Sequence, residues 1–73
     1  MLTPKNLIFK MKHGKNVSQS DFDNCCKYLL ACSYKDAAEY TGNITDCIDK
    51  LSQPTSDKYM GMFTGAGQRT KLI

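Results

Sequence analysis

Hydrophobic positions recur at helical spacing in two central stretches of the chain. The first stretch has apolar side chains at i, i+3, i+4, i+7 and i+8, namely Phe22, Cys25, Cys26, Leu29 and Leu30. The second repeats this spacing with Ile44, Cys47, Ile48 and Leu51, and Pro54 interrupts the pattern soon afterwards. An apolar stripe of this period is typical of an amphipathic helix with one buried face. The sequence therefore predicts a helix in each stretch.

Residues typical of helix starts and ends predict a short helix between these two helices. Ser20 followed by Asp23 resembles the beginning of a helix, and Ser33 followed by Asp36 repeats the signal. The helix that Ser33 opens would carry Ala37, Ala38 and Tyr40 and would end at Gly42. We therefore expect three consecutive helices in the centre of the chain.

The N-terminal segment allows two interpretations. Thr3 and Pro4 form a helix-start signal, because threonine caps free N–H groups and proline fits the first turn. One face of that helix would carry Leu7, Ile8 and Met11, and Gly14 would end it. Residues 9–12, however, alternate between apolar and basic side chains, as a short edge strand would. Either a fourth helix or an edge strand is expected here.

Beyond Pro54 the composition changes. Three glycines are interspersed with aromatic residues and methionines, and this glycine content predicts that no stable helix forms. The residues are Tyr59, Met60, Gly61, Met62, Phe63, Gly65 and Gly67. We expect a helical domain over residues 1–53 and a flexible tail over residues 54–73. The aromatic and methionine cluster would either dock on the core or bind a partner. The predicted fold is all-α, with three or four helices.

Composition favours a soluble protein with one small core. Seventy-three residues suffice for one domain, and 41% hydrophobic with 23% charged residues is ordinary for globular proteins. No apolar run approaches the roughly 20 residues of a membrane helix, and the N-terminus lacks the apolar stretch of a secretory signal. We expect a cytoplasmic protein without a membrane partner.

The cysteines and the single histidine do not suggest chemistry. No C-x-x-C pair starts a zinc site, and the four cysteines can pack as small, reduced hydrophobes. His13 lies in a lysine-rich segment beside a glycine, so no catalytic triad is apparent. Residues 65–67 lack the lysine of a phosphate loop. We expect no enzyme activity, metal, cofactor or small-molecule substrate.

The net charge of +3 is unevenly distributed. Residues 1–17 contain four lysines and no acid, residues 18–53 contain three lysines and six acids, and residues 54–73 are again basic. Basic ends around an acidic centre favour contact with an acidic partner through the ends. The alternative is that these lysines only form a solvated, solubilising surface.

Residues 34–51, YKDAAEYTGNITDCIDKL, resemble the helix-turn-helix of small phage and bacterial regulators such as repressors and excisionase-like proteins. Counted from Tyr34, Ala38 is the fifth position, Gly42 the ninth, Ile48 the fifteenth and Leu51 the eighteenth. In this motif a small residue lets two helices approach, a glycine permits the turn, and later aliphatic residues seal the second helix on the first. The departures are Asn43, where an apolar residue is usual, and the acidic Asp46 and Asp49.

The resemblance implies transcriptional regulation, and two hypotheses follow. In the first, a homodimer would bind duplex DNA, with Asn43, Thr45, Asp46, Asp49 and Lys50 facing the bases. The phosphates would be contacted by Lys10, Lys12, Lys15, Arg69 and Lys71. In the second, which the acidic centre favours, the chain would bind bacterial RNA polymerase by protein contact and modulate initiation or termination in the host cytoplasm, as small phage regulators do. A third interpretation gives residues 34–51 only a packing role.

Overall fold

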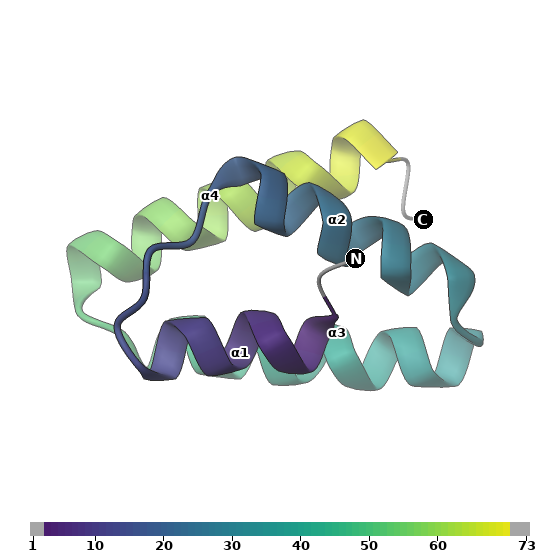
Figure 1. Cartoon of the computed structure of the whole chain (residues 1–73), viewed down its shortest axis with the longest axis horizontal. Coiled ribbons are helices and arrows are strands. Elements are labelled where there is room, and N and C mark those ends of the chain that lie inside the picture. The colour runs from purple at the N-terminus through teal and green to yellow at the C-terminus, as the bar shows by residue number, and fades with distance from the viewer. Residues whose placement is uncertain (1–2, 71–73) are drawn as a thin grey trace.

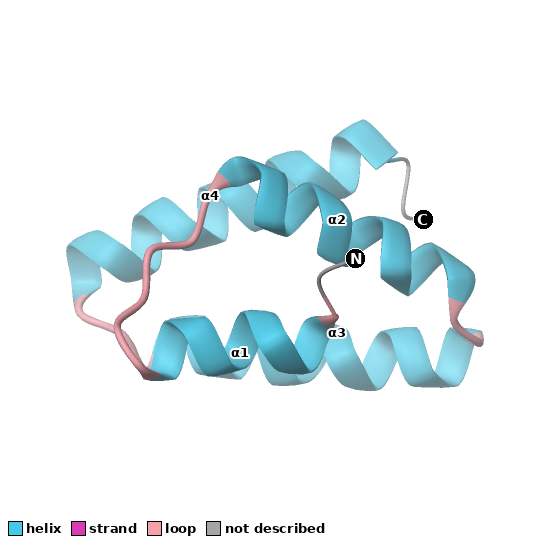
Figure 2. Ribbon diagram, in the orientation of Figure 1, coloured by secondary structure: helices cyan, strands magenta, loops and turns pink. Residues whose placement is uncertain are grey.

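The computed structural model describes residues 3–70, with the side chains of residues 3–68, and shows four α-helices in this range (Figures 1 and 2). They are α1 (Pro4–Lys12), α2 (Gln19–Ala31), α3 (Tyr34–Asp49) and α4 (Gln53–Thr70). The predicted all-α class is therefore confirmed. The N-terminal segment is the fourth helix, so the alternative of an edge strand is wrong.

The helices form two layers, with α1 beside α3 in one and α2 beside α4 in the other (Figure 1). The pair α2 and α4 shares the most extensive contact. Each helix directs apolar side chains into the space between the layers, where Leu7, Phe22, Leu29, Ile44 and Ile48 are almost completely buried. One hydrophobic core thus holds all four helices.

Local signals account for where the helices begin and end. The Thr3 hydroxyl accepts the Asn6 amide at 3.3 Å, and Gly14 follows α1 with a φ of 66°, a conformation that glycine adopts without strain. Ser33 caps α3 as predicted. The cap of α2 is Ser18, which forms a capping box with Asp21, two residues before the predicted signal at Ser20.

The predicted helix-turn-helix is wrong, because α3 runs without interruption through residues 34–49. Gly42 lies exposed in the middle of this helix, and Ala38 is exposed and not buried at a helix contact. The physical reason is the apolar stripe, which continues across Gly42 from Ala37 and Tyr40 to Ile44 and Ile48. Glycine costs a helix only about 1 kcal/mol relative to alanine, less than burial of that stripe provides.

The predicted flexible tail is also wrong for residues 54–70, which belong to α4. Tyr59, Phe63 and Ala66 on this helix are buried against the core. The Phe22 ring lies 5.8 Å from the Tyr59 ring and 6.0 Å from the Phe63 ring, between ring centroids. Of the two interpretations of the aromatic cluster, docking on the core holds for these rings, and no domain boundary separates residue 53 from residue 54.

Candidate nucleic-acid interface

The outward face of α1 is basic and carries exposed rings. Lys5, Phe9, Lys12 and His13 follow one another at helical spacing on the side of α1 opposite the buried Leu7. The exposed Lys15 follows directly after the turn at Gly14. We call these five residues, Lys5, Phe9, Lys12, His13 and Lys15, the basic face of α1. Because residues 1–17 contain no acid, no carboxylate from the same segment balances their charge.

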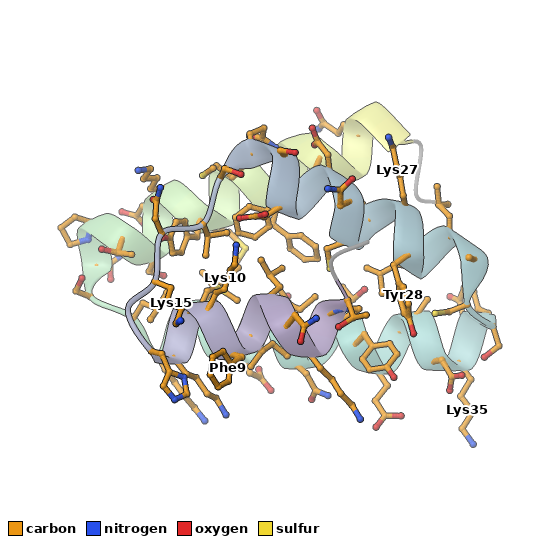
Figure 3. The ribbon with its side chains drawn as sticks, in the orientation of Figure 1. Phe9, Lys10, Lys15, Lys27, Tyr28 and Lys35 are labelled. Carbon is orange, nitrogen blue, oxygen red and sulfur yellow. The ribbon has the colours of Figure 1, made fainter. Side chains whose placement is uncertain are left out.

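The rings of Phe9 and His13 form a stacked pair on this face. Their centroids lie 4.0 Å apart with an angle of 24° between the ring planes. His13 Nδ1 donates a hydrogen bond to the Phe9 carbonyl oxygen at 2.9 Å, which orients the imidazole. Phe9 remains 51% exposed, and the Lys15 ammonium lies 5.8 Å from its ring centroid (Figure 3). A large aromatic surface therefore stands in solvent among lysines.

Lys10 takes another direction, although the sequence grouped it with Lys12 and Lys15. It points from α1 toward α2 (Figure 3), and its ammonium lies 3.2 Å from Asp21 Oδ2. That oxygen also accepts the Ser18 amide at 3.0 Å. The Ser18 amide and, to a smaller degree, Lys10 hold the pKa of Asp21 below its ordinary value, against the opposing effect of burial. The charge of Lys10 is thus already balanced within the fold.

Four predicted contact residues meet between α1 and α3. Lys12, Asn43, Asp46 and Lys50 line a pocket of about 300 Å³, together with Ile8 and Cys47. Two lysines and one carboxylate give this pocket a positive balance. The pocket therefore extends the basic face of α1 to the C-terminal end of α3. An anion such as a phosphate group could bind in it.

The structure does not bring the other predicted residues into this pocket. The Thr45 hydroxyl donates a hydrogen bond to the Thr41 carbonyl oxygen at 2.9 Å, so it is engaged within α3. Asp49 is exposed but does not line the pocket. Arg69 lies in the last turn of α4, where only the backbone is described, and Lys71 lies outside the described residues.

Sequence reasoning missed Lys5, Phe9 and His13 as contact residues. A signal for them existed, because Phe9 falls outside the helical stripe of Leu7, Ile8 and Met11. A bulky apolar residue on the polar face of a helix is left in solvent, and large exposed aromatic groups occur at binding surfaces. In the alternative of an edge strand over residues 9–12, Phe9 would lie on the same side as Met11. Phe9 would then be expected in the core, so this alternative hides the signal.

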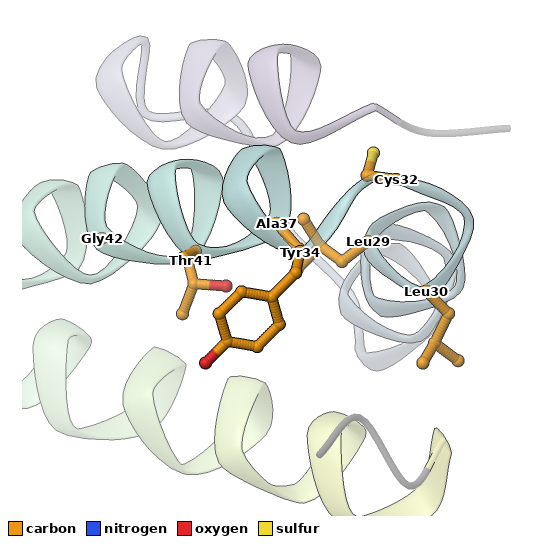
Figure 4. Close-up of a pocket in the computed structure, with 8 residues that line it drawn as sticks. Leu29, Leu30, Cys32, Tyr34, Ala37, Thr41 and Gly42 are labelled. Carbon is orange, nitrogen blue, oxygen red and sulfur yellow. The ribbon is translucent and has the colours of Figure 1, made fainter.

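A second, uncharged surface lies between the end of α2 and the beginning of α3. It is a groove of about 650 Å³ whose lining residues are neutral (Figure 4): Leu29, Leu30, Cys32, Tyr34, Ala37, Ala38, Thr41 and Gly42. Tyr34 is 91% exposed and Leu30 is 51% exposed. This groove is an uncharged, largely apolar surface, separate from the basic face of α1.

The Cys25 thiol is completely buried. Burial and the neighbouring Cys26 and Cys32 raise the pKa of Cys25 to about 12, so this thiol stays protonated at neutral pH. Within residues 3–70 there is no group of three histidine, cysteine or acidic side chains that could hold a metal ion. In the same range, every helix is too short or too polar to cross a membrane.

Comparison with known protein families, with characterised proteins and with solved structures gave no match to this chain.

Proposed function

We propose that this chain is a non-enzymatic module that binds nucleic acid through the basic face of α1. The observation that supports the proposal is the set of exposed lysines, Lys5, Lys12 and Lys15, on one side of a segment without acids. Attraction to nucleic acid arises mainly from cations that replace the counterions of the phosphates. The pocket with Lys12 and Lys50 adds a place where one phosphate could be held from two sides.

This proposal requires no recognition helix. The exposed side of α3 carries Asp36, Glu39 and Asp49, which phosphates would repel, and Asp46 offsets one of the two lysines of the pocket. We therefore assign the contact to α1, with Lys50 as the contribution of α3, and we propose no reading of base edges in a duplex groove. A regulatory role in transcription would follow from occupancy of the nucleic acid and not from a helix-turn-helix.

The test is a binding titration of the purified chain with labelled DNA at several salt concentrations. We expect affinity to fall steeply with salt, and each of Lys5→Ala, Lys12→Ala and Lys15→Ala to reduce the logarithmic salt slope by about 1. Lys35→Ala is the matched control, because Lys35 is equally exposed but lies at the start of α3. Absence of binding at low salt, or an equal effect of Lys35→Ala, would contradict the proposal.

The uncharged groove favours a second candidate, contact with a protein partner. Tyrosine in an apolar setting is frequent among the residues that dominate protein interfaces, and Tyr34 is 91% exposed at this groove. Bacterial RNA polymerase stays a prediction as that partner. If this function is correct, we expect the immobilised chain to recover polymerase. Tyr34→Ser should abolish this recovery, and Lys12→Ala should not affect it. Recovery that depends on Lys12 and not on Tyr34 would contradict it.

A further inference from the structure

We propose, on the basis of the nucleic-acid function above, that the ligand is single-stranded and that its bases extend the stacked pair of Phe9 and His13. The observation behind this step is the juxtaposition of two exposed, stacked rings with lysines on the same side of α1. Lysines alone would suit any polyanion. The rings add a surface that only a ligand with accessible flat groups can use.

Base accessibility distinguishes a single strand from a duplex. In a duplex the faces of the bases are stacked on one another, so a phenylalanine reaches them only if neighbouring base pairs are first unstacked, which costs free energy. In a single strand each base has a free π-face, and proteins of this kind combine a positive surface with aromatic side chains on which the bases stack. Phe9 is half-exposed in the free protein, so a base of a single strand can reach its ring without that cost.

The ring pair is prearranged for this contact. The hydrogen bond from His13 Nδ1 to the Phe9 carbonyl oxygen, at 2.9 Å, and the 4.0 Å ring separation hold both rings in one orientation. A base that joins the stack therefore meets a surface that is already ordered, and little side-chain freedom is lost on binding. The Lys15 ammonium near Phe9 is on a flexible stem and can move to a phosphate when a base arrives (Figure 3).

The lysines lie on both sides of the rings along the helix axis. Lys5 precedes Phe9 by about 6 Å of helix rise and Lys12 follows it by about 4.5 Å. A strand running along α1 would thus have one phosphate near Lys5, a base on the rings, and a later phosphate near Lys12. The pocket between Lys12 and Lys50 continues this path toward α3.

The experiment compares three labelled probes of similar charge by fluorescence anisotropy: oligothymidine, a hairpin duplex, and a strand of the same length whose sites are abasic. We expect oligothymidine to bind the chain at least about fivefold more tightly than the abasic strand, which is the lower range of the effect of base stacking. Phe9→Leu should remove this difference. It should leave the affinity for the duplex and the abasic strand unchanged, because the lysines remain.

One further variant and a folding control keep the result interpretable. Phe9→Trp retains an aromatic surface, so it should keep the preference for oligothymidine, and its fluorescence should be quenched when a base stacks on it. Circular dichroism should show all variants folded, since Phe9 is half-exposed. Equal affinity for the three probes, with no effect of Phe9→Leu, would overturn this inference and leave the proposed function standing. Absence of binding to every probe at low salt would overturn both.

Discussion

Asp21 joins two helices through one oxygen, because its Oδ2 lies 3.2 Å from the Lys10 ammonium of α1 and accepts the Ser18 amide at the start of α2 at 3.0 Å. The Lys10 contact bridges the two helices, and the bond from the Ser18 amide is one half of the capping box of Ser18 and Asp21. The contact with Asp21 also withdraws Lys10 from the basic face of α1. A lysine that looks equivalent to Lys12 in the sequence is therefore part of the scaffold, and we expect its substitution to affect stability more than ligand affinity.

Stability should decrease in acid because of Asp21. The pKa of this carboxyl is lowered in the folded chain, first by the Ser18 amide and then by Lys10. The folded state thus binds its proton more weakly than the unfolded state, for which the ordinary value is 3.8. The stabilisation is present above 3.8 and is lost as pH falls through the lower folded value.

Urea unfolding of the chain and of Asp21→Asn, at neutral and at acidic pH, measures this effect. At neutral pH we expect the substitution to cost about 1 kcal/mol, as loss of a partly exposed, charge-assisted contact does. The difference between the two proteins should shrink below pH 3.8. A constant difference at every pH would show that the Asp21 charge does not contribute.

Gly42 and Gly14 should respond in opposite directions to alanine. Gly42 lies inside α3, and a Cβ added there would meet no atom within 4 Å. Gly42→Ala should therefore stabilise the fold by about 1 kcal/mol. Gly14 has a φ of 66°, so Gly14→Ala should destabilise the fold by about 1 kcal/mol. Thermal unfolding of both variants is the measurement, and a loss of stability with Gly42→Ala would indicate a turn at that position.

The residues that sequence reasoning placed correctly are those whose role depends on near neighbours. Thr3, Gly14 and Ser33 begin or end helices through contacts within one turn, and a stripe such as that of α2 needs only the helical period. Gly42 favours a turn by its local preference, but the apolar stripe that continues past it keeps the helix intact. Whether a glycine ends a helix depends on what its neighbours bury.

Helix α4 and the direction of Lys10 depended on residues distant in the sequence. The glycines of α4 lower its intrinsic helix preference, and burial of Tyr59 and Phe63 against Phe22 compensates for it. The composition of residues 54–70 alone does not predict that contact. In the candidate site Lys12, Lys15 and Lys50 were predictable from the sequence, whereas the stack of Phe9 and His13 required knowing that residues 9–12 are helical.

Packing of α4 should be essential to the fold. Phe63 is 8% exposed and its ring pairs with that of Phe22, so Phe63→Ala should cost about 3 kcal/mol, near the lower range for loss of a buried phenylalanine. That is a large part of the stability expected for a domain of this size. Thr64→Ala is the control, since Thr64 is exposed on the same helix and should change stability by less than about 0.5 kcal/mol. Urea unfolding followed by circular dichroism would show equal stabilities if residues 54–70 did not pack.

The cysteines should differ in their reaction with alkylating reagents, because only a thiolate that solvent reaches reacts quickly. Cys32 is partly exposed at the groove between α2 and α3, whereas Cys25 is fully buried and has its pKa raised to about 12. A short exposure of the folded chain to iodoacetamide at neutral pH should therefore modify Cys32 first. Cys25 should react only when urea opens the core, at the rate of global unfolding. Mass spectrometry of the digested protein identifies each modified thiol, and modification of Cys25 before Cys32 in the folded chain would contradict the burial of α2 against the other three helices.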